Sequence, residues 1–72
     1  MPERFILQKS EKPNHWVVTD TELDIVGIFE NGKFNETQKF NMLNDTHPGI
    51  GKITQSMREI GEWLLTNHPE KV

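Results

Sequence analysis

Residues 49–54, Gly-Ile-Gly-Lys-Ile-Thr, come nearest in this chain to a phosphate-binding loop. That loop requires Gly-x4-Gly-Lys-Ser/Thr, because its backbone N–H groups cradle phosphates and the hydroxyl after the lysine holds a metal ion. Here Thr46 stands at the first glycine position, and Ile53 stands where the hydroxyl is required. We therefore interpret the segment as the start of a helix, whose free N–H groups can bind an anion only nonspecifically.

Three carboxylates, Asp20, Glu22 and Asp24, stand two residues apart. An extended chain would place them on one face, and Ca²⁺ prefers oxygen ligands. An EF-hand loop that begins at Asp20 would need glycine and glutamate where the chain has Ile25 and Asn31. The segment is therefore interpreted as a solvated acidic turn, and no bound metal is expected.

The histidines and serines are the remaining candidates for catalysis or metal binding. His15, His47 and His68 are too far apart in the chain to share one helical face, and the last two flank a predicted helix about 28 Å long. Ser10 and Ser56 both lack the Gly-x-Ser-x-Gly context of a nucleophile, and the chain has no cysteine. We expect no catalytic, cofactor-binding or metal-binding residue, and no enzymatic activity.

The composition indicates one small domain over residues 1–72. Apolar residues make up 33% of the 72, so the hydrophobic core must be small. The absence of cysteine and of any export signal favours the cytoplasm. No apolar run approaches the roughly 20 residues that span a bilayer, so no membrane partner is expected.

The net charge of −3 argues against nucleic acid as the partner, because no basic stripe can neutralise several phosphates. A regulatory nucleic-acid-binding protein remains an alternative only if Lys9, Lys12, Lys33 and Lys39 converge on one face. A carrier of a small ligand or metal is a further alternative.

The first half of the chain predicts strands at 4–9, 15–20 and 25–30, which are rich in β-branched and aromatic residues. Turn signals at 10–14 and 21–24 separate them. The dipeptide Asn-Gly that follows the third strand favours a type I′ hairpin turn, which would place Phe29 across from Phe34.

The segment after this turn allows two interpretations. It could continue as a strand over 33–39, or form a short strand at 33–35 followed by a short helix near 36–44. In the second case Asn35 would cap the helix, with Gln38 as its capping-box partner. We favour the second interpretation, because the apolar alternation fails after Phe34.

The second half predicts a long amphipathic helix over about 49–67. Its apolar stripe follows spacings of three and four residues: Ile50, Ile53, Met57, Ile60 and Leu64. The whole pattern predicts an α+β fold, in which an antiparallel sheet of three or four strands is packed on one face by this C-terminal helix.

The apolar residues of the strands occupy both alternations. One contains Phe5, Leu7, Trp16, Val18, Ile25 and Phe29, and the other contains Ile6, Val17, Val26 and Ile28. A single helix covers only one face, so the other face stays partly apolar and exposed. We therefore expect a small protein-interaction module that acts as a homodimer, with Trp16, Phe29, Gly61 and Trp63 as interface candidates. Gly61 lies beside the helical stripe, where a close approach by another backbone, within the chain or across a dimer, would explain a glycine.

Three runs of residues carry a resemblance. They are 19–22 (Thr-Asp-Thr-Glu), 33–40 (Lys-Phe-Asn-Glu-Thr-Gln-Lys-Phe) and 57–64 (Met-Arg-Glu-Ile-Gly-Glu-Trp-Leu). In these runs the chain resembles small uncharacterised single-domain proteins of Bacteroides-type gut bacteria. The resemblance implies a bacterial protein and no site residues.

Overall fold

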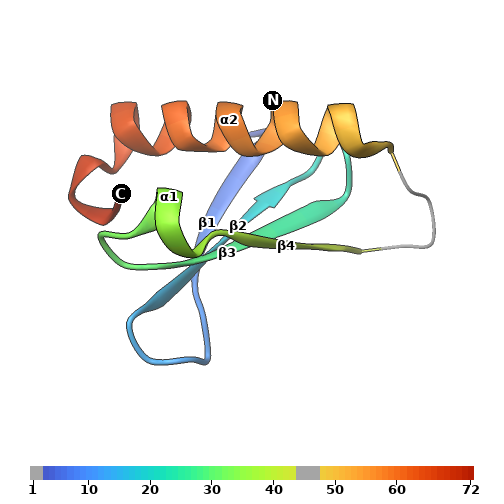
Figure 1. Cartoon of the computed structure of the whole chain (residues 1–72). Coiled ribbons are helices and arrows are strands. Elements are labelled where there is room, and N and C mark those ends of the chain that lie inside the picture. Colours follow the sequence, from blue (N-terminus) through green and yellow to red (C-terminus); the bar gives the residue numbers. More distant parts are fainter. Residues whose placement is uncertain (1–2, 44–47) are drawn as a thin grey trace.

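A four-stranded antiparallel sheet lies beneath one long helix (Figure 1). The computed structural model describes residues 3–43 and 48–72. The elements follow in the order β1 (Phe5–Lys9), β2 (His15–Asp20), β3 (Ile25–Glu30), α1 (Phe34–Thr37), β4 (Lys39–Met42), α2 (Ile50–Asn67) and the 3-10 turn η1 (Pro69–Lys71). This arrangement confirms the predicted α+β fold. Of the helices described here, none is long and apolar enough to cross a membrane.

Each strand pairs with the strand next to it in the chain, in the order β1-β2-β3-β4. Leu7 lies opposite Val18, which lies opposite Gly27. Both predicted turns between the first three strands are present. Each contains one residue with positive φ, Asn14 at 61° and Asp24 at 54°, and these are residue types that tolerate this conformation.

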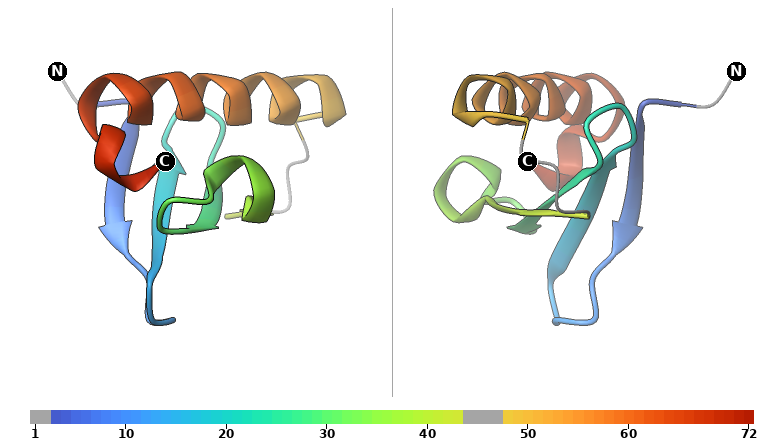
Figure 2. Two further views of the ribbon diagram at one scale, coloured as in Figure 1. Left: turned by 60° about the vertical axis from the view of Figure 1, so that its left-hand side comes forward. Right: turned by 90° about the vertical axis from the view of Figure 1, so that its right-hand side faces the viewer.

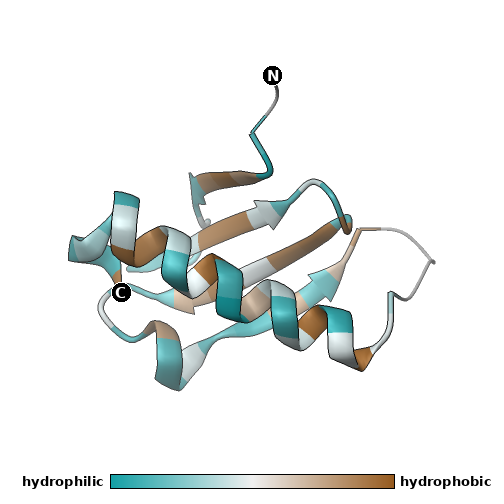
Figure 3. Cartoon of the chain, turned by 90° about the horizontal axis from the view of Figure 1, so that it is seen from above, coloured by the Kyte–Doolittle hydropathy of each residue, from teal (hydrophilic) through white to brown (hydrophobic). Residues whose placement is uncertain are grey.

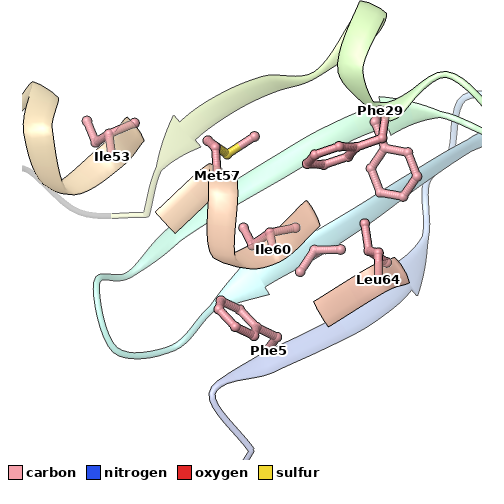
Figure 4. Packing of buried hydrophobic residues seen from close by; sticks show 8 residues of the cluster. Phe5, Phe29, Ile53, Met57, Ile60 and Leu64 are labelled. Atoms are coloured by element: carbon pink, nitrogen blue, oxygen red, sulfur yellow. The ribbon is translucent and has the colours of Figure 1, made fainter. Parts of the chain in front are cut away.

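The two apolar alternations occupy the two faces of the sheet, as the sequence predicts. Phe5, Val18, Ile25 and Phe29 are buried, and most of this set packs with α2 in one core (Figure 4). The alternate residues point to the other face, where Ile6 is 42% exposed. Among the described elements, both helices lie on the same side of the sheet (Figure 2).

Helix α2 begins at Ile50, with Gly49 as its N-cap. The sequence predicted a start at about residue 49, so the predicted and observed starts agree to within one residue. The buried side chains of its stripe are Ile53, Met57, Ile60 and Leu64. The prediction that Ile50 shares this buried stripe is wrong, because Ile50 is 70% exposed. Seen from above, α2 crosses the strands diagonally, and its first turn lies beyond the edge of the sheet (Figure 3).

The segment after Gly32 forms a helix first and a strand second, so both sequence interpretations are wrong. A type I′ turn needs positive φ at two residues, and of Asn31 and Gly32 only Gly32 has it, at 80°. The chain therefore does not return directly as a strand. The N-cap of α1 is Lys33, without a side-chain cap, so the predicted capping box does not form.

Phe34 is the tertiary anchor that explains this local structure. It is the first residue of α1 and is 4% exposed. Its ring packs edge-on against Phe29, with ring centroids 5.2 Å apart. The predicted Phe29–Phe34 contact therefore exists, but it joins a strand to a helix.

Gly61 explains why α2 can approach this aromatic ring. A Cβ atom at Gly61 would lie 3.0 Å from Cε1 of Phe34. The sequence predicted a close approach by another backbone at this glycine; the close approach lies within the chain, but it is made by the Phe34 side chain and not by a backbone.

Two glycines in α2 make a matched pair for substitution by alanine. Apart from its chain neighbours and the backbone of α2, no atom of the described residues lies within 4 Å of a Cβ at Gly51, so Gly51→Ala should stabilise the fold by up to about 1 kcal/mol through helix propensity. Gly61→Ala gains the same propensity but overpacks against Phe34, at a cost of about 1–3 kcal/mol. We expect the two substitutions to change the free energy of unfolding in opposite directions. Gly61→Ala should lower it by about 1 kcal/mol in urea titrations. Equal stabilisation by both would contradict this packing.

Candidate functional site

The two flanks of α2 differ in chemistry. Toward β1, charged and hydrogen-bonded side chains tie the helix to the sheet. Toward β4, a groove lined mainly by apolar side chains stays open. Figure 2 shows α1 below α2 on this second side.

Asp20 is the centre of the polar flank and has no exposed surface. The Arg4 guanidinium donates to both carboxylate oxygens, with Nε 3.2 Å from Oδ1 and Nη2 3.0 Å from Oδ2. The Ser56 hydroxyl also donates to Oδ2. The backbone N–H groups of Glu22 and Leu23 donate to Oδ1, at 3.0 and 3.3 Å.

These donors decide the charge state of Asp20. Burial alone would favour the neutral acid, but the hydrogen bonds from Arg4 and Ser56, followed by those from the turn backbone, outweigh it. The pKa of Asp20 is therefore held below its ordinary value. Arg4 also donates to Glu59 of α2, so the network joins β1, β2 and α2. Because donors from Arg4, from the turn and from α2 already bind its oxygens, the Asp20 carboxylate has a structural role that connects these parts of the chain.

The expectation that Asp20 shares a solvated face with Glu22 and Asp24 is wrong. Asp20 ends β2 on the buried face, while the other two lie exposed in the turn that follows. Across residues 3–43 and 48–72, no three histidine or acidic side chains are grouped so that they could hold a metal ion. The sequence does contain a signal for the buried position of Asp20, because Asp20 continues the alternation of Trp16 and Val18 along β2.

The groove on the other flank has a volume of about 600 Å³. Ile53, Met57 and Phe34 form its buried part. Its rim is exposed and includes Ile50 from the first turn of α2 and Leu65 from the last.

Three exposed large apolar side chains, those of Phe40, Ile50 and Leu65, line this groove. Six large apolar residues are exposed in the described part of the chain, and five of them belong to α2, to β4 or to the residue after β4. These five are Phe40 (38%), Met42 (39%), Leu43 (57%), Ile50 (70%) and Leu65 (64%). Strand β4 lies at the edge of the sheet and, among the described strands, pairs only with β3.

The four interface candidates from the sequence do not form this surface together. Phe29 has no exposed surface, so it cannot contact a partner, and naming it as an interface residue is wrong. Gly61 lines the groove but contacts Phe34 within the chain. Trp63 is half-buried, on the side of β1, where its ring meets that of Phe5 at 5.7 Å.

Trp16 is also half-buried and engaged within the chain. Its indole N–H donates to Asn31 Oδ1 at 3.0 Å, and the Lys71 ammonium lies 4.7 Å from its ring centroid. The groove residues Phe40 and Leu65 fall outside both periodic patterns. An apolar residue that fits neither the strand alternation nor the helical stripe was the signal that could have identified these two groove residues.

The histidines occupy separate places. Nδ1 of His15 lies 2.7 Å from the Pro13 carbonyl oxygen. His68 caps the carboxyl end of α2, and its ring lies 5.2 Å from that of Trp63. His47 lies outside the described residues, as does Thr46 of the phosphate-loop comparison.

The four lysines required for a nucleic-acid surface do not converge. Lys12 and Lys39 line one hollow, together with the acidic Glu36. Lys9 is in register with Trp16, on the opposite face from Lys39. Lys33 is paired with Glu30 at 3.1 Å.

Comparisons with protein-family models, with curated proteins and with solved structures found no match. No family is therefore assigned to the chain.

Proposed function

We propose that this chain is a small, non-enzymatic protein-interaction module that acts as a homodimer in the bacterial cytoplasm. The observation that carries the proposal is that the exposed side chains of Phe40, Ile50 and Leu65 line the open groove between α2 and β4. Exposed apolar surface rimmed by polar residues is typical of protein contact sites. The cytoplasmic location rests on the absence of cysteine, and the bacterial source on the sequence resemblance.

The size of the chain supports self-association. A stable interface commonly covers about 800 Å² on each partner, which is roughly one sixth of the 4948 Å² exposed here. Covering the groove would bury side chains such as Ile50 and Leu65 that the small core leaves in water. Burial of this surface adds hydrophobic stabilisation that a domain of 72 residues otherwise lacks.

Sedimentation velocity at several concentrations tests the proposal. We expect the sedimentation coefficient to rise with concentration from a monomer to a dimer value, with a dissociation constant in the micromolar range. The thermal midpoint should rise over the same concentrations, because dimerisation stabilises the folded state. A chain that stays monomeric at several hundred micromolar would contradict the proposal.

The groove volume favours one second candidate, a carrier of a small apolar ligand. Ligand sites commonly enclose about 300–1,000 Å³, and this groove measures about 600 Å³ with mainly apolar walls. A fluorescent apolar dye would then bind the native monomer with one-to-one stoichiometry. In a self-associating chain, dye binding should instead fall as the protein concentration rises.

A further inference from the structure

One exposed stripe of α2 runs beside the groove and differs from the buried stripe. Its members are spaced three or four residues apart: Ile50, Thr54, Arg58, Glu62 and Leu65. All five are exposed and line the groove. The stripe therefore has apolar ends and two opposite charges in its middle.

Arg58 and Glu62 are one helical turn apart and carry opposite charges. Within the described part of the chain, neither forms an ion pair. The opposite flank is different, because Arg4 and Glu59 are paired there. The two charges beside the groove are thus available to a partner.

This charge pattern is complementary to itself. In a two-fold symmetric interface the same patch meets its own copy, so if residue i contacts residue j, then j also contacts i. A patch with one sign of charge would repel its copy. Two opposite charges on one helix instead attract their copies when the two helices run antiparallel with the axis midway between the charges.

We infer that the occupant of the groove flank is a second copy of this chain, with its α2 antiparallel to the first. The two-fold axis passes near the level of Ile60, so Arg58 of each copy faces Glu62 of the other. This inference rests on the proposed self-association and adds its surface, direction and register.

The same register places the first turn of each α2 beside the last turn of the other α2 and its η1. Ile50 of each copy then lies level with η1 of the other, about 7.5 Å beyond the level of its Leu65, so these two side chains do not face each other directly. From Ile50 to Leu65 the stripe is about 22 Å long at 1.5 Å per residue. An interface of this length is at the small end of specific contacts, which fits a micromolar dimer.

Charge reversal tests the register. Arg58→Glu gives each copy two acidic residues at the interface, and Glu62→Arg gives each copy two basic ones. Each variant alone should dimerise at least about tenfold more weakly than the wild type, because like charges then face each other twice. Mixing the two variants should restore a heterodimer, and the double variant R58E/E62R should restore the homodimer.

Controls separate this interface from the other surfaces. Lys52→Glu reverses an exposed charge on α2 that does not line the groove, and Ile6→Glu places a charge on the open face of the sheet. Both should dimerise like the wild type, and circular dichroism should show that every variant is folded.

The outcomes are distinct. A wild-type dimer whose charge variants neither weaken association nor recover on mixing would overturn the inference and leave self-association standing. Loss of the dimer in Ile6→Glu alone would assign the interface to the open sheet face and also overturn it. A wild-type chain that is monomeric throughout would overturn the proposed function itself.

Discussion

Replacing Asp20 by asparagine is expected to lower the free energy of unfolding by about 3 kcal/mol. The side chain is completely buried and accepts hydrogen bonds from Arg4, from Ser56 and from the backbone of the following turn. Removal of one partner from a buried ion pair leaves the other uncompensated, at a cost of about 3–5 kcal/mol. Arg4 retains Glu59 as a partner, so the lower end of that range is expected. Urea unfolding followed by tryptophan fluorescence measures the loss.

The control for this substitution is Glu22→Gln. Glu22 also pairs with Arg4, at 3.3 Å, but its side chain is 68% exposed, so its loss should cost less than about 1 kcal/mol. The pH dependence gives a second check. Because the pKa of Asp20 is lower in the folded chain, its contribution is present above the unfolded value of about 3.9 and is lost as pH falls through the folded value. The stability difference between wild type and Asp20→Asn should therefore shrink in that acid range, and a constant difference would contradict this role.

Replacing Phe29 by alanine is expected to cost about 3–5 kcal/mol, since it removes a fully buried ring from the core. Phe34 packs edge-on against this ring, so α1 should loosen as well. The matched control is Phe40→Ala, where the ring is 38% exposed and the expected loss is under about 2 kcal/mol. Thermal and urea unfolding should be measured at low micromolar concentration.

Near-ultraviolet circular dichroism and the unfolding midpoints distinguish the outcomes for this pair. A Phe29→Ala variant no less stable than Phe40→Ala would show that Phe29 is not the centre of the core. Phe40→Ala should also weaken dimerisation, since its ring lines the groove.

The strands and the long helix could be predicted because each repeats a simple period over several residues. β2 and β3 alternate between two faces, and α2 keeps spacings of three and four from Ile53 to Leu64. These patterns report burial directly, since burial is what selects apolar residues at those positions.

The order of α1 and β4 could not be predicted from a periodic apolar pattern. A helix of four residues is too short to show a period, and its position depends on Phe34 packing against Phe29 and Gly61. The contact with Gly61 joins residues that are distant in the sequence. The Asn-Gly dipeptide indicated a turn, and the tertiary contacts decided what followed it.

The sequence predicted that the candidate site is an apolar contact surface, but not which residues form it. The sequence indicated surplus apolar surface, and the structure places three of the six exposed large apolar side chains of the described residues along the groove between α2 and β4. The diagonal crossing of α2 decides this, because it leaves the first turn of α2, which begins at Ile50, beyond the edge of the sheet (Figure 3). A crossing angle is a property of packed ridges and grooves, which one helical stripe does not specify.

The pairing of each strand with its neighbour in the chain also has a kinetic consequence. The first three strands close over short turns, so little chain entropy is lost before the meander gains its hydrogen bonds. Contacts between nearby residues favour folding in milliseconds or less. The Arg4–Glu59 bond spans 55 positions and forms only after α2 docks. Interactions that are absent from the folding transition state affect mainly the rate of unfolding, so we expect loss of the Arg4–Glu59 bond to speed unfolding more than it slows folding.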